Sequence, residues 1–194
     1  MKKDTILVAV VVLVVGLIIG WIVGQKSAGP TPASVKAPSA PMQQPSMPMA
    51  NAQQKIGELK AIVAREPNNR QAWVALGNLH FDADQPMDAI EAYQKALDLN
   101  ANDANVLTDQ GVMFRRLGQF DRAIDNFTRA YQADPVHGTS LFNLGIVYRY
   151  DLQNFAKAQE AWSKFLAINP SGPGSDRVRQ ELEFLNKQST VSKP

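Results

Sequence analysis

The chain repeats itself every 34 residues, and this period constrains its fold more than any other feature. In the central unit, residues 104–137, the recurring positions hold small, apolar and aromatic residues and a proline: Leu107, Gly111, Phe114, Ala123, Phe127, Ala130 and Pro135. Their counterparts 34 residues earlier are Trp73, Gly77, His80, Ala89, Tyr93, Ala96 and Ala101. The following copy has Leu141, Gly145 and Tyr148 in register and then, one residue late, Ala158, Trp162, Phe165 and Pro170. A fixed period of this length indicates a stack of similar structural units.

Each unit reads as two antiparallel helices. In the first unit, the apolar periodicity predicts one helix over about 70–81 and a second over about 86–99. Pro86 falls in the first turn of the second helix, where its missing N–H costs nothing, and Asp84 is placed to cap that helix. In the next unit, Gly118 separates the two helices.

Two further helices flank the three units. Residues 53–65 place apolar side chains at helical spacing, and we expect this helix to be the second half of an incomplete unit. Residues 175–188 place Val178, Leu182 and Leu185 on one face, with Ser175 as the expected N-cap, which predicts a solubilising capping helix.

The third unit departs from the other two in length and packing. It gains one residue, which we expect in its internal turn, within 150–154. Phe165 stands where a small residue is expected, so we predict that this last helix packs against the C-terminal segment.

The motif Trp73-x2-Leu76-Gly77-x2-His80, followed by Ala89-x3-Tyr93, closely resembles the tetratricopeptide repeat (TPR) pattern. The later units match it through Ala123-x3-Phe127…Pro135 and Leu141-x2-Leu144-Gly145-x2-Tyr148. The departures are Gln110 for a leucine, His80 for an aromatic residue and Phe165 for a small one. The resemblance implies an all-α solenoid of about three helix-turn-helix repeats with capping helices, whose concave groove binds a protein or an extended peptide.

The whole chain divides into eight predicted segments. They are a short N-terminal tail (1–4), a transmembrane helix (5–24), a proline-rich disordered linker (25–52), a capping half-repeat (53–69), three TPR units (70–103, 104–137 and 138–172) and a C-terminal capping helix with its tail (173–194). The linker composition buries too little apolar surface to order itself, and its prolines favour a semi-rigid spacer.

The predicted transmembrane helix is a run of 20 residues without a charge, residues 5–24. At about 1.5 Å per residue such a helix spans roughly 30 Å, the thickness of the hydrocarbon core. A cleaved signal peptide is the competing interpretation, because Lys2 and Lys3 precede the run. The length of the run and the missing A-x-A site favour an uncleaved anchor.

The flanking lysines favour a cytoplasmic N-terminus, which predicts a single-pass protein of the bacterial inner membrane with its repeats in the periplasm. Gly16, Gly20 and Gly24 lie on one face of the predicted span, and this spacing permits a homodimer through close helix contact. The alternative is that glycine is simply frequent in membrane helices.

Charge and composition exclude several kinds of site. The net charge is +2, but residues 1–52 carry +3 and the remainder −1, which argues against nucleic-acid binding by the repeats. The absence of cysteine excludes disulfides and thiolate chemistry. The two histidines, His80 and His137, form no catalytic or metal motif, and Asp82, Asp84 and Asp88 lack the glycine and distal glutamate of a calcium loop. We therefore predict no enzyme activity, no cofactor and no metal.

The resemblance implies which residues line the groove, because the first helix of each TPR unit contributes them. The fifteen predicted groove residues are Gln71, Val74, Asn78, Phe81, Asn105, Thr108, Val112, Arg115, Arg116, Thr139, Phe142, Asn143, Ile146, Arg149 and Tyr150. Amide side chains can bond a peptide backbone, and Arg115 or Arg149 can bind a carboxylate through two bonds. The alternative is that Arg115 and Arg116 only solvate the end of a helix.

The chaperone-type carboxylate clamp of the family is only partly present. Asn78 matches one of its positions, whereas Val74 and Asp109 replace a cation and an amide. We therefore expect a membrane-anchored adaptor that binds a protein or peptide partner other than a chaperone tail. Two alternatives stay open: a TPR subunit of cytochrome c maturation, and a structural membrane subunit that associates with itself.

Overall fold

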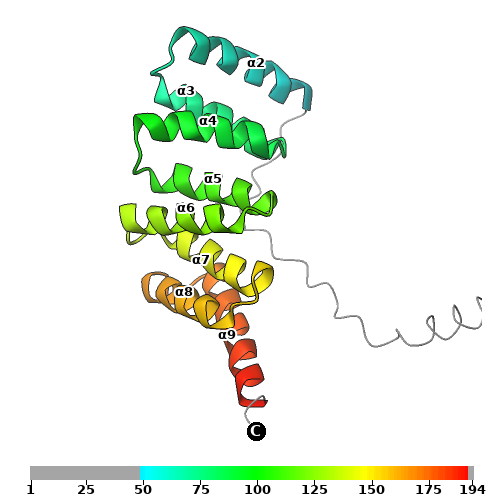
Figure 1. The fold of residues 1–194 in the computed structure, drawn as a ribbon, viewed down its shortest axis with the longest axis vertical. Coiled ribbons are helices and arrows are strands. Elements are labelled where there is room, and N and C mark those ends of the chain that lie inside the picture. The colour runs from blue at the N-terminus through cyan, green and yellow to red at the C-terminus, as the bar shows by residue number, and fades with distance from the viewer. Residues whose placement is uncertain (1–48, 192–194) are drawn as a thin grey trace, which may run out of the picture. The chain divides into compact units, whose positions relative to one another are not determined.

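The structure is a computed structural model that describes the backbone of residues 49–191 and the side chains of residues 51–187. Within this part of the chain every regular element is helical (Figure 1). The α-helices are α2 (Met49–Arg65), α3 (Arg70–Asp82), α4 (Pro86–Leu99), α5 (Ala104–Arg116), α6 (Phe120–Ala133), α7 (Gly138–Ile146), α8 (Phe155–Ile168) and α9 (Pro173–Val191), and a π-helical turn η1 (Val147–Asp151) continues α7.

The predicted anchor, the glycine face within it and most of the predicted linker lie outside the described residues. Among the described helices, none is long and apolar enough to cross a membrane. Helix α2 begins at Met49, four residues before the predicted start at 53, because the Met-Ala-Asn-Ala stretch after Pro48 continues the helix toward the N-terminus.

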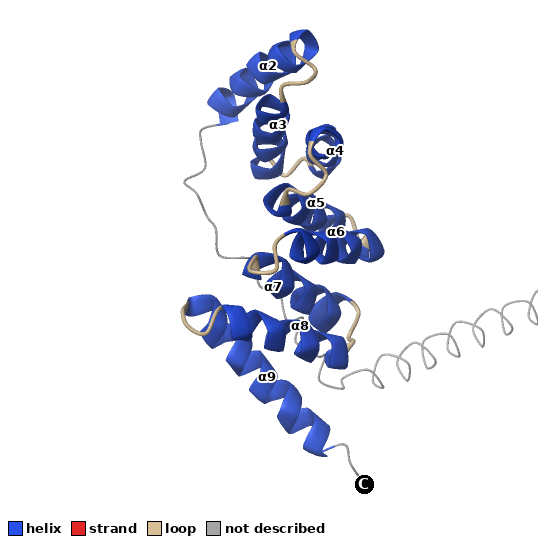
Figure 2. Cartoon of the chain, turned by 90° about the vertical axis from the view of Figure 1, so that its left-hand side faces the viewer, coloured by secondary structure: helices blue, strands red, loops and turns tan. Residues whose placement is uncertain are grey.

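The helices stack in pairs, as the period predicts. Each helix packs on the next one along the chain from α2 to α9, and α3 also contacts α5, as α5 contacts α7 (Figure 2). The first helices of the three repeats are therefore neighbours on one side of the stack. First helices begin at residues 70, 104, 138 and 173. In this register α2 takes the place of a second helix and α9 takes the place of a first helix.

A glycine in the first helix faces an aromatic ring of the second helix in every repeat. A Cβ atom added to Gly77 would lie 2.5 Å from the Tyr93 ring, and one added to Gly111 would lie 2.6 Å from Phe127. The same pairing joins Gly145 to Trp162, whose Nε1 donates to the carbonyl oxygen of Phe142. The 34-residue signature thus records a close contact between two helices.

The departure at Gln110 is explained by a buried polar network. Gln110 is 1 % exposed, and its amide nitrogen donates to the carbonyl oxygen of Ile90 at 3.1 Å. Its amide oxygen accepts from Asn126, which also donates to the carbonyl oxygen of Leu107. Because each buried amide finds partners, a polar residue is tolerated where the family prefers leucine.

The turn between the two helices of a repeat has a left-handed residue at one fixed place. Asp84 has φ 54°, Gly118 has φ 70° and Gln153 has φ 52°. The prediction that Asp84 caps α4 is therefore wrong, because Asp84 forms the turn and the N-cap position falls to Gln85 without a side-chain bond. Side-chain caps occur at Asn69 and Asp103, before α3 and α5, and at Asn154, before α8.

The extra residue of the third repeat lies within its first helix. α7 and η1 together run from residue 138 to 151, whereas α3 and α5 have 13 residues each. The wider π turn accommodates the additional residue, so the prediction that it enlarges the following turn is wrong.

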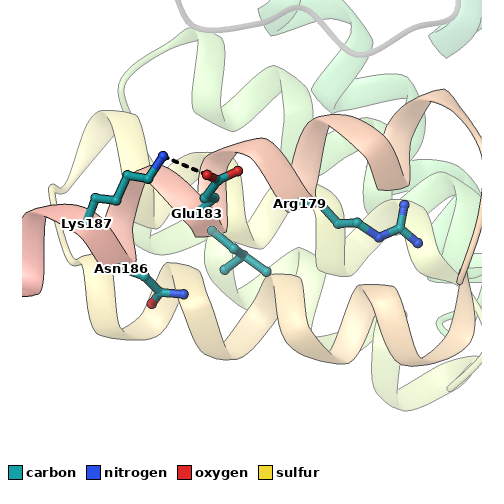
Figure 3. Close-up of a pocket in the computed structure, with 5 residues that line it drawn as sticks. Arg179, Glu183, Asn186 and Lys187 are labelled. Atoms are coloured by element: carbon teal, nitrogen blue, oxygen red, sulfur yellow. Dashed lines mark ion pairs between the residues drawn. The ribbon is translucent and has the colours of Figure 1, made fainter.

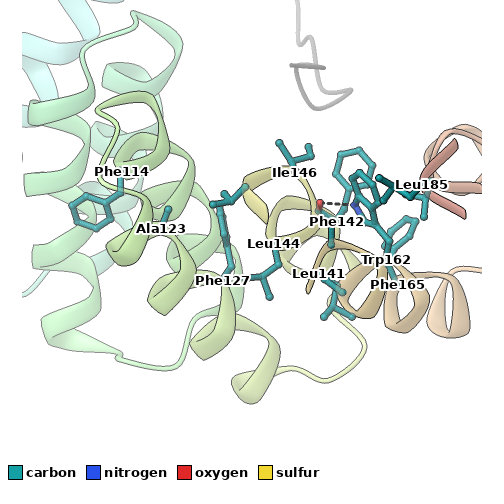
Figure 4. Close-up of a cluster of buried hydrophobic side chains, with 14 residues drawn as sticks. Phe114, Ala123, Phe127, Leu141, Phe142, Leu144, Ile146, Trp162, Phe165 and Leu185 are labelled. Atoms are coloured by element: carbon teal, nitrogen blue, oxygen red, sulfur yellow. Dashed lines mark hydrogen bonds between the residues drawn. The ribbon is translucent and has the colours of Figure 1, made fainter. Parts of the chain in front are cut away.

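Phe165 packs as predicted against the C-terminal segment. It belongs to one buried cluster with Phe142 of α7 and with Val178 and Leu185 of α9 (Figure 4). The prediction that Ser175 caps this last helix is wrong: α9 begins two residues earlier, and the Ser175 hydroxyl donates to the carbonyl oxygens of Asn169 and Ser171.

Candidate peptide-binding face

All fifteen predicted groove residues lie on α3, α5, α7 and η1, the first helices of the three repeats. We call the surface formed by these residues the inner face. In the first two repeats it is open, with Gln71, Asn78, Asn105 and Arg116 exposed and Val74, Phe81, Val112 and Arg115 half-buried. Amide and apolar side chains alternate there in a way that suits an extended chain.

The third repeat contributes little accessible surface. Phe142 and Ile146 are 6 % and 1 % exposed, because they pack in the buried cluster that α8 and α9 complete. Asn143 is 3 % exposed, and its side-chain amide nitrogen donates to the carbonyl oxygen of Thr139, one helical turn earlier. Thr108 of the second repeat is also buried, and its hydroxyl donates to the carbonyl oxygen of Ala104. Thr139 remains exposed at the start of α7. A partner can reach only the remaining predicted residues in this arrangement.

The arginines of the inner face are bonded within the chain. Arg115 donates to both carboxylate oxygens of Asp151, at 2.5 and 3.1 Å, and so joins the second repeat to the third. Arg116 donates to Asp84 at 2.7 Å and lies over the Phe81 ring, which joins the second repeat to the first. These two side chains bridge repeats, an arrangement that neither sequence interpretation anticipated.

Arg149 and Tyr150 meet a carboxylate from α9. Glu181 lies 3.4 Å from the Arg149 Nε atom and accepts a hydrogen bond from the Tyr150 hydroxyl. Burial and this hydrogen bond to Glu181 raise the pKa of the Tyr150 hydroxyl. A carboxylate from a partner would have to displace Glu181 before it reached Arg149.

A second group of polar side chains lies between α3 and α5. The Tyr93 hydroxyl donates to the Asn78 Oδ1 atom at 2.8 Å. Burial raises the pKa of the Asp109 carboxyl to about 6, and the charges of Asp103 and Asp82 add to this effect. Burial and the charges of Asp109 and Asp82 also raise the pKa of the Tyr93 hydroxyl, against the opposing effect of Arg116. Four acidic or phenolic groups therefore influence one another here.

The sequence pattern gives Tyr93 only as a recurring position of the repeat and Asp109 only as a departure from the chaperone clamp. Its position four residues after Asn105 puts Asp109 on the same side of α5, a signal that was available in the helical period. The proximity of Asp82 depends on how α3 stacks on α5, and no local pattern contains it.

The two histidines occupy structural positions. His80 is 3 % exposed, and its Nδ1 atom lies 2.6 Å from the Gln85 Oε1 atom, in line with the packing position expected from the sequence. His137 contacts Asn105 and Thr108 of the preceding repeat, and burial lowers its pKa. Among the described residues no group of three or more potential ligands could hold a metal ion.

A shallow hollow of about 450 Å³ lies on α9, and none of its lining residues belongs to the inner face (Figure 3). It is lined by Arg179, Leu182, Glu183, Asn186 and Lys187. By register, Gln180 of α9 takes the place of the glycine that faces an aromatic ring in each repeat. A large polar residue suits a solvated surface better than a close helix contact, and the capping role of this helix stays a prediction.

Two family models described as tetratricopeptide repeat match residues 69–135 and 108–173, which together make up more than half of the chain. The chain belongs to the tetratricopeptide repeat family. As a member it has a fold that serves protein–protein interaction, and the predicted all-helical TPR solenoid is confirmed for the described residues.

Curated relatives match part of this chain and part of their own length. Small glutamine-rich tetratricopeptide repeat-containing protein 2 of Mycosarcoma maydis is 34 % identical over 97 residues, which cover 50 % of this chain and 27 % of that protein. Cytochrome c-type biogenesis protein CycH of Pseudomonas aeruginosa is 25 % identical over 145 residues, which cover 71 % of this chain and 35 % of CycH. The chain thus spans about a quarter to a third of the length of these relatives.

Solved structures share the fold over most of the described chain. A crystal structure of MamA has a TM-score of 0.68 and 26 % identity, and the match covers 74 % of this chain and 81 % of MamA. The first TPR of Spaghetti (RPAP3), bound to the HSP90 peptide SRMEEVD, has a TM-score of 0.56 and 20 % identity, over 63 % of this chain and 96 % of that one. The latter likeness concerns the fold alone.

Proposed function

We propose that this protein is a membrane-anchored adaptor that holds a partner protein or extended peptide on the inner face of its first two repeats. The observation that carries the proposal is the open inner face of α3 and α5, where exposed amides stand beside half-buried valines. Exposed amides bond a peptide backbone in any sequence, and the valines add apolar contact. The absence of enzyme activity stays a prediction, because some relatives that match short stretches are named transferases.

A photo-crosslinking experiment tests the use of the inner face. A photoreactive residue at Asn78 or Asn105 should capture the partner, whereas the same residue at Lys95, exposed on α4, should not. Adducts that form equally well from Lys95 would contradict binding at the inner face. If no adduct forms from Asn78, Asn105 or Lys95, the adaptor function is contradicted.

The membrane anchor rests on the uncharged run at residues 5–24. The chain contains no cysteine, so a single Asp125→Cys substitution on the exposed side of α6 gives one labelling site. In intact cells of a Gram-negative host, a maleimide that cannot cross the inner membrane should label this cysteine if the repeats are periplasmic. Deletion of residues 5–24 should release the protein from the membrane fraction. Retention in the membrane after the deletion would contradict the anchor.

A role in cytochrome c maturation is the second candidate, favoured by the similarity to CycH over 71 % of this chain. It requires that the inner face binds an apocytochrome segment. Loss of the protein should then lower the amount of c-type cytochrome, as measured by haem staining. Unchanged cytochrome levels would leave the general adaptor function in place.

A structural role through self-association is the remaining alternative, with Gly16, Gly20 and Gly24 as the contact. Crosslinking of the wild type and of Gly20→Ile in membranes tests it. An equal yield of dimer from both proteins would exclude the glycine contact.

A further inference from the structure

The arginines on and beside the inner face are already paired with acids of this chain, so they leave no positive charge to balance other acids there. Each of four arginines forms an ion pair with an acid of another helix or turn: Arg70–Asp103, Arg115–Asp151, Arg116–Asp84 and Arg149–Glu181. Asp82 and Asp109 have no ion pair to any residue that the structure describes. The first two repeats therefore present an uncompensated negative charge to a partner.

The position of Asp109 makes this charge local. It is half-buried on α5, and Asp82 is exposed at the end of α3, the neighbouring first helix that contacts α5. Asn78 is exposed on α3, one helical turn before Asp82. Its Oδ1 atom accepts a hydrogen bond from the Tyr93 hydroxyl, so its amide nitrogen is left as a donor for a partner's backbone. Val74 and Val112 lie half-buried on the same two helices and can contact an aliphatic stem.

We infer that the first two repeats bind a basic, extended segment of a partner protein, with a lysine or arginine side chain placed between α3 and α5 against Asp109 and Asp82. This inference rests on the proposed function and names the chemistry of its partner. It reverses the expectation that Arg115 or Arg149 binds a carboxylate, since Asp151 and Glu181 already occupy those guanidinium groups. The third repeat contributes little to this contact, because Phe142 and Ile146 are buried.

Three matched peptides test the inference with the full-length protein in detergent. Each is an acetylated and amidated peptide of alternating serine and alanine, with a central pair of arginines, of citrullines or of aspartates. Citrulline keeps the shape of arginine without its charge, so the difference between the first two peptides isolates charge complementarity. Binding is measured by fluorescence anisotropy at low and at high salt.

We expect the arginine peptide to bind at least ten-fold more tightly than the citrulline peptide, and this advantage to shrink at high salt. The Asp82→Asn, Asp109→Asn double variant should lose the advantage. Asp121→Asn, which removes an exposed carboxylate of α6, should keep it.

Equal binding of the arginine and citrulline peptides, or preferential binding of the aspartate peptide, would overturn the inference. An aspartate preference that is lost in Arg115→Gln would restore the carboxylate interpretation. Partner crosslinks from Asn78 in the experiment above would then still support the adaptor function, so the two failures are distinguishable.

Discussion

Arg115 and Asp151, 36 residues apart in the sequence, form a two-bond ion pair across the boundary between the second and third repeats. Their side chains are 21 % and 16 % exposed, so water screens the pair only in part. Asp151 is the last residue of the π turn. The pair therefore depends on how that turn ends the first helix of the third repeat.

Removal of this pair should weaken the contact between the two repeats. We expect Arg115→Ala and Asp151→Ala each to lower the free energy of unfolding by about 1–2 kcal/mol, with a coupling energy on the order of 1 kcal/mol in the double variant. Urea denaturation followed by circular dichroism measures all three variants. Purely additive effects would show that the pair contributes nothing to stability.

The glycine–aromatic contact should not tolerate a methyl group. Gly111→Ala places a Cβ atom 2.6 Å from the Phe127 ring, so we expect a loss of about 2 kcal/mol of stability from overpacking. Gly57→Ala is the matched control, because nothing lies within 4 Å of its Cβ position on α2. That variant should gain about 0.5–1 kcal/mol from helix propensity. Thermal denaturation measures the stability of both variants. An unchanged stability of Gly111→Ala would contradict the overpacking explanation.

The left-handed turn position should respond in opposite directions in two repeats. Gly118→Ala should cost about 1 kcal/mol, because φ 70° is unfavourable for a residue with a Cβ atom although the space is open. Gln153→Gly should gain up to about 1 kcal/mol, because it relieves the same conformation at φ 52°. Chemical denaturation compares the two. A loss of stability in Gln153→Gly would mean that its side chain contributes more than the backbone strain costs.

The raised pKa of Asp109 predicts a pH dependence of stability. The folded protein holds this proton up to a pH of about 6, whereas the ordinary value is 3.8. The folded state thus binds more protons in that window, so this residue's contribution to stability falls as the pH rises from about 4 to about 6 and stays low above it. The shift corresponds to a penalty on the order of 3 kcal/mol at neutral pH.

Asp109→Asn should remove that penalty. We expect the variant to be more stable than the wild type at pH 7.5 and to show little difference at pH 3.5, in urea titrations at both values. The difference between the two proteins isolates Asp109 from Asp82, Asp103 and Arg116, which face the same region. A constant difference at the two pH values would show that Asp109 has an ordinary pKa.

The helices of the repeats were predictable because their signals are local. The second helix of the first repeat runs over residues 86–99 as expected, and the first extends one residue beyond the predicted 81. The errors concern turns and ends. Asp84 is a typical capping residue by type, yet the chain needs a left-handed residue at that place, and residue type alone does not distinguish the two roles.

The inner face was predictable as a set of positions and not as a set of available groups. The register placed Arg149 and Phe142 on the correct helix and its π-helical continuation, but it contained no information on what α9 would cover. Asp109 shows the opposite case, since its pKa is raised by burial and then by the charges of Asp103 and Asp82. A pKa shift of this kind arises from burial and from charges distant in sequence.

The sequence by itself determined the period and the helical pairs, because these repeat every 34 residues and depend on spacing along single helices. The tertiary structure alone decided which charges meet. The π turn places Asp151 next to Arg115, α9 brings Glu181 to Arg149, and Asp82 and Asp109 have no ion pair to any residue that the structure describes. These pairings depend on the angle at which one repeat packs on the next, and that angle results from the sum of many side-chain contacts.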